Sequence, residues 1–458
     1  MGRYYFEDFL SGFDSRGIRA CSCGREHLIA TRTVLAEPGA LERSGELLVE
    51  RYGSRTALWV LSDENTERAA GARWKRGGPA ARVSSRVLRG SPRPVPTEEL
   101  VRQLVSEVKA DSPDLLVAVG SGVISDLVKK VSLDTGIPNW CIATAASVDA
   151  YSSATSAIRV DGYHKPLPAA VSEVIVCDID VIGEAPREMF LAGLGDLLAK
   201  FIAFLDWNLS RIMTGEHYCA FASGAALGSA RAALAAAGRL GEEPREAART
   251  LTDAVLTSGF AMQATGASRS AASAEHTMAH FWEMAHAVGC ARYDLHGILV
   301  GAACALVLRA YRALYAAATR VEPDAPRRLA GYDGEQAWEA ALEPGLAPFI
   351  GKVREETAHR RFDRAVLAER LEAFRRSRQE ILALAAPALD ELASAVEALR
   401  RLGYPFSPAE LGISADLFLL PGRNIRLLRR RYSGFDLAYE LDLGGLLNDE
   451  MERCVREG

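Results

Sequence analysis

The sequence predicts an α/β domain with a parallel sheet, followed by an all-helical domain. Up to about residue 180, short apolar runs bounded by Gly, Pro, Asp and Ser alternate with helical patterns, which is typical of βαβ units. From about residue 187, long Ala- and Leu-rich segments with helical periodicity take over and strand-like runs nearly vanish. We therefore expect two domains, residues 1–185 and residues 186–458.

Each element follows from its local pattern. The strand-like runs are 56–62, 115–119, 140–144 and 174–177, and the patterns at 97–109 and 123–133 predict intervening helices. In the second half, helical periodicity covers 187–212, 217–238, 246–266, 274–288, 297–317 and 364–401. The second half is therefore expected to be helical throughout.

Composition indicates a soluble protein that acts on small molecules. Of 458 residues, 49% are hydrophobic and 25% are charged, and 54 basic against 59 acidic residues give a net charge of −5. This balance has no excess of basic residues, so it does not indicate binding to nucleic acid. Apolar stretches are broken by charge before about 18 residues and no secretory signal is visible, so we expect no membrane span and a cytoplasmic location. The apolar helix faces could pack within one chain or between two chains, so a homo-oligomer such as a dimer is possible on this pattern.

The eight cysteines are scattered along the chain, which is typical of reduced cytosolic thiols rather than of a disulfide framework. Cys21, Cys23 and His27 could be half of a zinc site. No second Cys/His pair with zinc-finger spacing follows them in the sequence. We therefore do not predict zinc at this motif.

Two strand ends carry features of a nucleotide site. Gly120, Ser121 and Gly122 connect a predicted strand to a predicted helix, where backbone N–H groups and the positive helix end can approach a pyrophosphate. A tight turn without a ligand is the alternative. Asp63 ends the 56–62 strand, where a carboxylate can accept from ribose hydroxyls and favour NAD over NADP. A helix N-cap is the alternative for Asp63.

A third strand end is also polar. Thr144, Ser147, Asp149 and Ser153 follow the strand at 140–144. In an open parallel sheet the carboxyl ends of the strands form the ligand crevice. We therefore expect these side chains to line one cleft with residues 120–122.

The second half contains a metal-ligand pattern. Four of the eight histidines fall within residues 276–296, and His276 and His280 are four apart, so they share one helical face. His296 follows at the start of the next helix, and Asp196 precedes Lys200 by four residues. One Asp and two His are the ligands of an open catalytic metal site. Structural roles for individual histidines are the alternative.

These motifs and others recur in order along the chain: CSCGREH at 21–27, DENT at 63–66, GSGVISD at 120–126, SVDAYSS at 147–153, GD at 195–196, EH at 275–276, HFWE at 280–283, LHG at 295–297 and RYS at 431–433. The sequence thereby resembles the sn-glycerol-1-phosphate dehydrogenases, especially the bacterial branch, within the dehydroquinate synthase-like and iron-containing alcohol dehydrogenase superfamily. The resemblance implies a Rossmann-like N-terminal domain, a helical C-terminal domain and an active site in the cleft between them.

The resemblance also implies roles for individual residues. Asp196, His276 and His296 would bind one divalent ion, Zn²⁺ or Ni²⁺. His280 and Asp149 would touch the substrate. The contacts to NAD or NADP would come from Gly120, Ser121, Gly122, Val123, Asp126, Thr144, Ser147 and Ser153, with Asp63 at the ribose.

The implied reaction is reversible hydride transfer between NAD(P)H and dihydroxyacetone phosphate, which gives sn-glycerol 1-phosphate for phospholipid metabolism. The ion would polarise the ketone. His280 or an ordered water would supply the proton, and Asp149 could orient the hydroxyl groups. Lys200 would offset the carboxylates at the metal or pair with the substrate phosphate.

The chain departs from the family pattern beside these residues. Ile298 follows Gly297 where the family usually has Glu, and the other departures are Ser270, Ser273, Ala146 and Ala150. An altered substrate pocket is therefore expected, so a related polyol or ketone dehydrogenase is one alternative. A dehydroquinate synthase-like cyclase that uses NAD transiently is a second alternative, and a scaffold protein without activity is a third.

Overall fold

The computed structural model describes residues 4–77, 82–90, 94–160, 163–239, 243–287, 295–323 and 364–457. The chain divides into two compact units. Unit 1 comprises Met1–Leu197 and Phe221–Ser268, and unit 2 comprises Leu198–Ala220 and Arg269–Gly458. The domain boundary after residue 185 stays a prediction.

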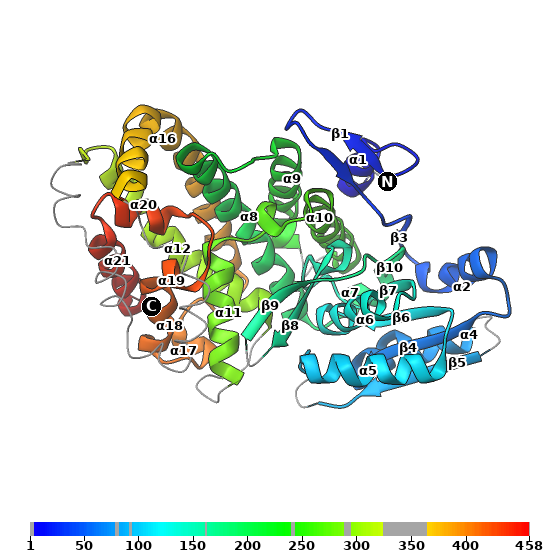
Figure 1. Cartoon of the computed structure of the whole chain (residues 1–458). Coiled ribbons are helices and arrows are strands. Elements are labelled where there is room, and N and C mark those ends of the chain that lie inside the picture. Colours follow the sequence, from blue (N-terminus) through cyan, green and yellow to red (C-terminus); the bar gives the residue numbers. More distant parts are fainter. Residues whose placement is uncertain are drawn as a thin grey trace. The chain divides into compact units, whose positions relative to one another are not determined.

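Unit 1 is built on a parallel sheet of six strands (Figure 1). The strands are β3 (Thr33–Glu37), β4 (Ala57–Asp63), β5 (Arg82–Leu88), β6 (Leu115–Gly120), β7 (Asn139–Ala143) and β10 (Val174–Asp178). Their order is β3-β10-β7-β6-β4-β5, and every neighbouring pair is parallel. The predicted parallel sheet is therefore confirmed, and the sequence prediction omitted only the two edge strands, β3 and β5.

Helices cover both faces of this sheet. One apolar cluster joins Leu48, Trp74, Val117 and Trp140. The other joins strand residues such as Leu116 with residues of α5 (Glu98–Asp111) and α6 (Gly122–Thr135). Because both faces are covered, the central strands read as continuous apolar runs.

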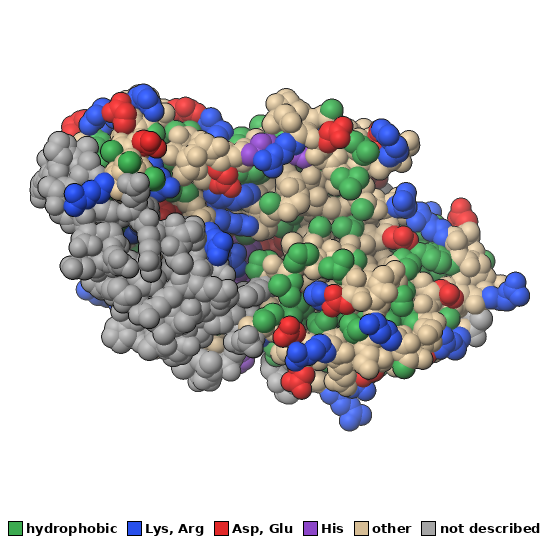
Figure 2. Space-filling model, in the orientation of Figure 1, with side chains coloured by type: hydrophobic (Ala, Val, Ile, Leu, Met, Phe, Trp, Pro, Cys, Tyr) green, Lys and Arg blue, Asp and Glu red, His purple; other side chains and the backbone are tan. Residues whose placement is uncertain are grey.

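Further elements of unit 1 surround the sheet. The antiparallel hairpins are β1 (Ile18–Ala20) with β2 (Glu26–Leu28), and β8 (Thr155–Val160) with β9 (Tyr163–Pro168). The helices are α1 (Tyr5–Leu10), α2 (Ala40–Tyr52), α3 (Glu64–Thr66), α4 (Ala72–Gly77), α7 (Ile179–Gly183), α9 (Ala220–Ala236) and α10 (Pro244–Thr265). Helix α8 (Arg187–Thr214) contributes residues to both units. On the face shown in Figure 2, basic and acidic side chains are interspersed over the sheet-containing part of the chain.

The described residues of unit 2 contain helices and no strand. The helices are α11 (Ala274–Ala287), α12 (His296–Ala318), α16 (Arg364–Arg401), α17 (Pro408–Leu411), α18 (Ala415–Arg423), α19 (Ile425–Leu428), α20 (Gly434–Glu440) and α21 (Gly444–Glu457). Helix α12 is long and apolar enough to cross a membrane by length and composition, but 83% of its most apolar window is buried in the protein. Its contacts with α11, α16 and α21 account for this apolar character.

A buried lysine anchors the polar segment that follows β7. Lys129 on α6 is fully buried, and its Nζ donates to the carbonyl oxygens of Ala150 and Thr155 at 2.7 Å each. The same Nζ lies 3.1 Å from Oδ1 of Asp126. The Asp126 carboxylate also accepts from the backbone N–H of Ala157 at 3.0 Å. Lys129 and Asp126 therefore fix the segment between β7 and β8 against α6.

We expect Lys129→Met to lower the free energy of unfolding by about 3–5 kcal/mol, because it leaves the Asp126 carboxylate buried without its ion-pair partner. Urea unfolding of the full chain measures this loss. Lys130→Met is the matched control, since neighbouring Lys130 forms a partly exposed ion pair with Asp134 and its loss should cost less than about 1 kcal/mol. Equal losses in the two variants would contradict the anchoring role of Lys129.

Candidate functional site

The turn between β6 and α6 combines a close strand–helix contact with an open helix end. A Cβ atom on Gly120 would lie 2.7 Å from Cβ of Ile124, so only glycine lets the strand approach this helix so closely. Ser121 occupies the N-cap of α6 and its side chain makes no capping hydrogen bond. The backbone N–H groups of the first helical turn, beginning at Gly122 and Val123, can therefore donate hydrogen bonds to an anionic group.

Asp63 lies at the carboxyl end of β4 and caps a helix. Its Oδ1 accepts from the backbone N–H groups of Asn65 at 2.8 Å and of Thr66 at 2.9 Å. Asp63 is therefore the N-cap of this helix, which was one of its two predicted roles. The contact of Asp63 with a ribose stays a prediction.

The polar residues after β7 are buried and tied to their surroundings. The N–H of Thr144 donates to the carbonyl of Gly120 at 3.2 Å, which places Thr144 and the glycine turn at one edge of the sheet. Ser147 is buried three residues further on. The hydroxyl of Ser153 donates to the carbonyl of Ala150 at 2.9 Å. Ser153, like Asp126, thus has a clear role in shaping the segment, and its contact with a cofactor stays a prediction.

Asp149 and Asp196 are neighbours in unit 1. The N–H of Asp149 donates to Oδ2 of Asp196 at 2.9 Å, and both residues are buried. The Ser258 hydroxyl donates to Oδ2 of Asp149 at 2.7 Å. The structure therefore places the backbone of Asp149, the predicted substrate-contacting residue, against the carboxylate of Asp196, the predicted metal ligand. Ser258 was missed by sequence reasoning, because it lies 109 residues from Asp149 inside an unremarkable helical pattern.

Three histidines of unit 2 form a cluster. His276 and His280 lie on α11, and His296 is the first residue of α12. The ring centroids are 6.1 Å apart for His276 and His280, 5.3 Å for His276 and His296, and 5.1 Å for His280 and His296. The predicted clustering of these histidines is therefore present in the fold.

Each of these imidazoles is oriented by a carboxylate at its Nδ1 atom. Nδ1 of His276 lies 2.8 Å from Oε1 of Glu275. Glu283 contacts two rings, with Oε2 at 2.8 Å from Nδ1 of His280 and Oε1 at 2.9 Å from Nδ1 of His296. Such contacts fix the Nδ1–H tautomer and leave Nε2 as the metal-binding nitrogen. The donor set therefore fits a divalent ion.

Burial lowers the pKa of His280 well below its ordinary value, although the Glu283 carboxylate opposes this shift. Glu275 and Glu283 had no predicted role. The signal that could have found Glu283 is its spacing, because it follows His280 by three residues and so shares its helical face.

Asp196 belongs to unit 1 and the three histidines to unit 2, so the three-residue ligand set stays a prediction. Lys200, one turn after Asp196 on α8, is fully buried. Its Nζ donates to the carbonyl of Ala271 at 3.2 Å, in the segment that leads into α11. The catalytic role of Lys200 also stays a prediction.

Ser273, one of the departures from the family pattern, holds the start of α11. Its hydroxyl donates to Oδ2 of Asp206 at 2.6 Å, and Oδ1 of Asp206 accepts from the Tyr311 hydroxyl at 2.7 Å and the Gly434 N–H at 3.0 Å. Burial raises the pKa of Asp206 to about 7, although these hydrogen bonds lower it. Ser273 therefore positions the turn before His276.

Cationic side chains lie beside the same turn. Arg431 donates from Nη1 to the carbonyl of Ala272 at 2.8 Å. Arg269 is buried and paired with Glu216, with Nε to Oε1 at 2.8 Å. Burial, with the charges of Arg429 and Arg269, lowers the pKa of Arg431 to about 9. An anion at this position would be favoured, and sequence reasoning assigned no role to these arginines.

Known proteins share this sequence pattern. Residues 35–186 match the family model of iron-containing alcohol dehydrogenases. The chain is 32% identical to a glycerol-1-phosphate dehydrogenase [NAD(P)+] of Hyperthermus butylicus, covering 54% of this chain and 70% of that protein. It is 28% identical to the Bacillus licheniformis protein of the same name, covering 67% of this chain and 77% of that protein.

Solved structures share the fold. A probable glycerol dehydrogenase from Sinorhizobium meliloti superposes with a TM-score of 0.60 at 17% identity, covering 93% of this chain and 97% of that chain. Maleylacetate reductase from a Rhizobium species gives a TM-score of 0.57 at 16% identity, covering 94% and 97%. These likenesses confirm the predicted fold class.

Glu283→Gln should weaken metal binding about 10- to 100-fold, because an amide cannot accept from both imidazoles. Titration of the metal-free chain with Zn²⁺ against a chelating dye measures the affinity, in a Cys21→Ser, Cys23→Ser background so that these thiols bind no zinc. Glu369→Gln on the exposed face of α16 is the control and should leave the affinity unchanged. Equal affinity in the wild type and the Glu283 variant would contradict the orienting role.

Asp206 should make stability depend on pH. Its folded pKa of about 7 lies above its ordinary value of 3.8, so the stability it contributes in its protonated form is lost as pH rises through about 7. Asp206→Asn cannot titrate. In urea titrations, the free energy of unfolding of the wild type relative to this variant should therefore fall between about pH 4 and about pH 7 and stay level above that. A difference that stays constant with pH would refute the assignment.

Proposed function

Because this chain belongs to the glycerol-1-phosphate dehydrogenase family of NAD(P)-dependent dehydrogenases, we propose that it transfers a hydride between NAD(P)H and dihydroxyacetone phosphate. The product would be sn-glycerol 1-phosphate, a precursor in phospholipid metabolism. The observation that carries this proposal is the cluster of His276, His280 and His296, whose rings are oriented by Glu275 and Glu283.

We propose that Asp196, His276 and His296 hold one divalent ion. The support in unit 2 is that His276 and His296 each have Nδ1 at a carboxylate, which directs Nε2 to a ligand. An ion bound there supplies Lewis-acid chemistry, which polarises a ketone oxygen. Imidazole and carboxylate ligands suit zinc, nickel and iron alike.

The proposed cofactor site is the edge of the sheet at the ends of β6 and β7. The first amide groups of α6 would bind the pyrophosphate, because a helix N-terminus carries unpaired N–H donors and a partial positive charge. Thr144 would lie beside them, since its N–H bonds to Gly120. In this proposal Lys129 and Asp126 hold the segment that contains Ser147 and Ser153.

We propose that His280 and Asp149 contact the substrate at its reacting groups. With Nδ1–H donated to Glu283, neutral His280 presents Nε2 as a proton acceptor. In alcohol oxidation Nε2 would take the hydroxyl proton, and in ketone reduction the same nitrogen would return it. The Asp149 carboxylate, held by the Ser258 hydroxyl, would accept from a substrate hydroxyl. Lys200 would offset the negative charge of Asp196 one helical turn away.

A phosphorylated substrate is supported by Arg429 and Arg431. Burial and the charges of Arg429 and Arg269 lower the pKa of Arg431, while the carboxylates of Glu216 and Glu275 oppose this shift. A phosphate group would relieve this repulsion and could accept two hydrogen bonds from one guanidinium. We further propose a small-molecule substrate as the partner of the chain. A cytoplasmic location and a homodimer stay predictions.

The activity is tested by following oxidation of NADH and of NADPH with dihydroxyacetone phosphate or unphosphorylated dihydroxyacetone. We expect oxidation with the phosphorylated ketone, and loss of at least about 100-fold in kcat/KM for Asp196→Ala and His276→Ala, because a lost Lewis acid removes several kcal/mol of transition-state stabilisation.

Asp390→Ala is the control, because Asp390 is an exposed residue of α16 that pairs with Arg312. It should leave kcat/KM unchanged. Full activity in Asp196→Ala would refute the metal assignment. Conversion of a sugar phosphate without net oxidation of NAD(P)H would instead establish a cyclase.

A further inference from the structure

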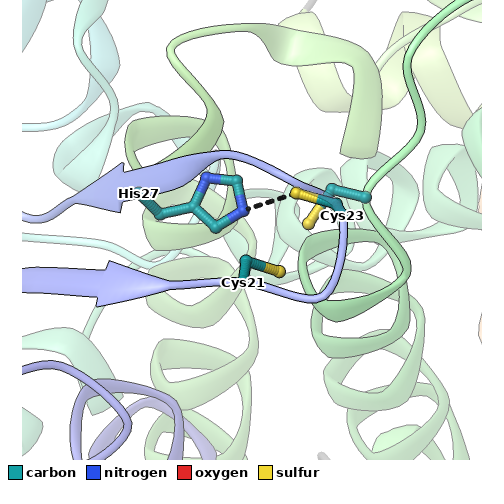
Figure 3. A group of neighbouring side chains, drawn as sticks. Cys21, Cys23 and His27 are labelled. Carbon is teal, nitrogen blue, oxygen red and sulfur yellow. Dashed lines mark hydrogen bonds between the residues drawn. The ribbon is translucent and has the colours of Figure 1, made fainter.

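The hairpin formed by β1 and β2 brings a Cys-x-Cys-x₃-His motif together at one turn. Ala20 pairs with Glu26, so residues 21–25 form the turn. The N–H of Cys21 donates to the carbonyl of Arg25 at 3.1 Å, and Gly24 allows the tight reversal with a φ of +83°. Figure 3 shows Cys21, Cys23 and His27 gathered at this end of the hairpin.

The three side chains have the spacing of metal ligands. The sulfur atoms of Cys21 and Cys23 and a ring nitrogen of His27 all lie within 4.8 Å of one another. Sγ of Cys23 is 3.4 Å from Nε2 of His27. Two ligands of a tetrahedral zinc ion, with Zn–S of about 2.3 Å and Zn–N of about 2.0–2.1 Å, are themselves about 3.6 Å apart. The observed separation therefore needs little adjustment to accept an ion.

The hydrogen bond of His27 selects the tautomer that a metal ligand needs. His27 is 3% exposed, and its Nδ1 lies 2.9 Å from the carbonyl oxygen of Ala264 on α10. A carbonyl can only accept, so Nδ1 carries the proton and the lone pair of Nε2 points toward Cys23. Metal-binding histidines typically have this arrangement, with the second nitrogen bonded to a carbonyl or carboxylate.

We propose that Cys21, Cys23 and His27 bind a structural Zn²⁺ ion. Two thiolates and one imidazole suit zinc better than magnesium or calcium, which prefer oxygen ligands. Binding would release one proton from each thiol and none from the neutral imidazole. A tetrahedral ion has one further position for a ligand. This site is separate from the histidine cluster of unit 2 and does not depend on the proposed function.

The ion would stabilise an element that is weak by itself. Strands β1 and β2 have three residues each, and an isolated two-stranded hairpin of this size is marginal in water. His27 connects the turn to α10 through Ala264. Zinc would therefore fasten the hairpin tip to a helix of the same unit.

Cobalt replaces zinc as a spectroscopic probe. The full-length protein is stripped of metal by a chelator under reducing conditions and then titrated with Co²⁺. Thiolate ligands give Co²⁺ an intense near-ultraviolet charge-transfer band. The ligands proposed for the catalytic ion, Asp196, His276 and His296, contain no sulfur, so this band reports the hairpin alone.

We expect the band in the wild type and about half its intensity or less in Cys21→Ser and Cys23→Ser, because each variant retains one thiolate. Cys454→Ser is the matched control, since Cys454 is also a free, partly exposed cysteine, and it should retain the full band. Absence of the band in the wild type, or an undiminished band in Cys21→Ser and Cys23→Ser, would overturn the proposal.

A second measurement needs no variant. In the wild-type protein, Zn²⁺ should slow alkylation of Cys21 and Cys23 at least about tenfold, as measured by peptide mass spectrometry, while Cys454 reacts at the same rate with and without Zn²⁺. Alkylation of Cys21 and Cys23 at the same rate in both conditions, or a Cys21–Cys23 disulfide in protein isolated with zinc, would exclude the site.

Discussion

The arrangement of unit 2 at its candidate site depends on one buried carboxylate. Glu283 accepts from His280 on its own helix and from His296 at the start of the next helix, so its two oxygens join α11 to α12. Each oxygen of this carboxylate has an imidazole partner, and buried polar atoms with a hydrogen-bond partner are tolerated. The same two bonds set the ring orientation of both histidines. Packing and chemistry therefore depend on the same side chain.

The sheet shows which parts of a fold a sequence pattern reveals. Strands β4, β6, β7 and β10 were predicted, because they are buried on both faces and read as continuous apolar runs. Strand β5 was missed, because it is an edge strand with a mostly exposed, polar pattern. The long helices of the second half were found to within a few residues, since Ala- and Leu-rich periodicity continues over many turns.

The candidate site was harder to predict, because function depends on partners that are distant in sequence. The motif histidines could be found by their spacing, but the Ser258 contact to Asp149 spans 109 residues. The role of Lys129 likewise depends on two carbonyl groups that follow it by 21 and 26 residues. At Cys21, Cys23 and His27, sequence reasoning looked for a second zinc-finger pair, whereas in the structure a single hairpin brings three possible ligand atoms within 4.8 Å of one another.

The anchoring of the segment after β7 has a consequence for how the family can diverge. Lys129 binds the main-chain carbonyls of Ala150 and Thr155, and every residue type carries such a carbonyl. The bonds made by Lys129 are therefore independent of the side chains at positions 150 and 155. Ala150, one of the departures from the family pattern, is a substitution that this anchoring accommodates, because Lys129 bonds to its main-chain carbonyl. A segment held in this way can exchange the side chains at these two positions while Lys129 keeps the same backbone partners.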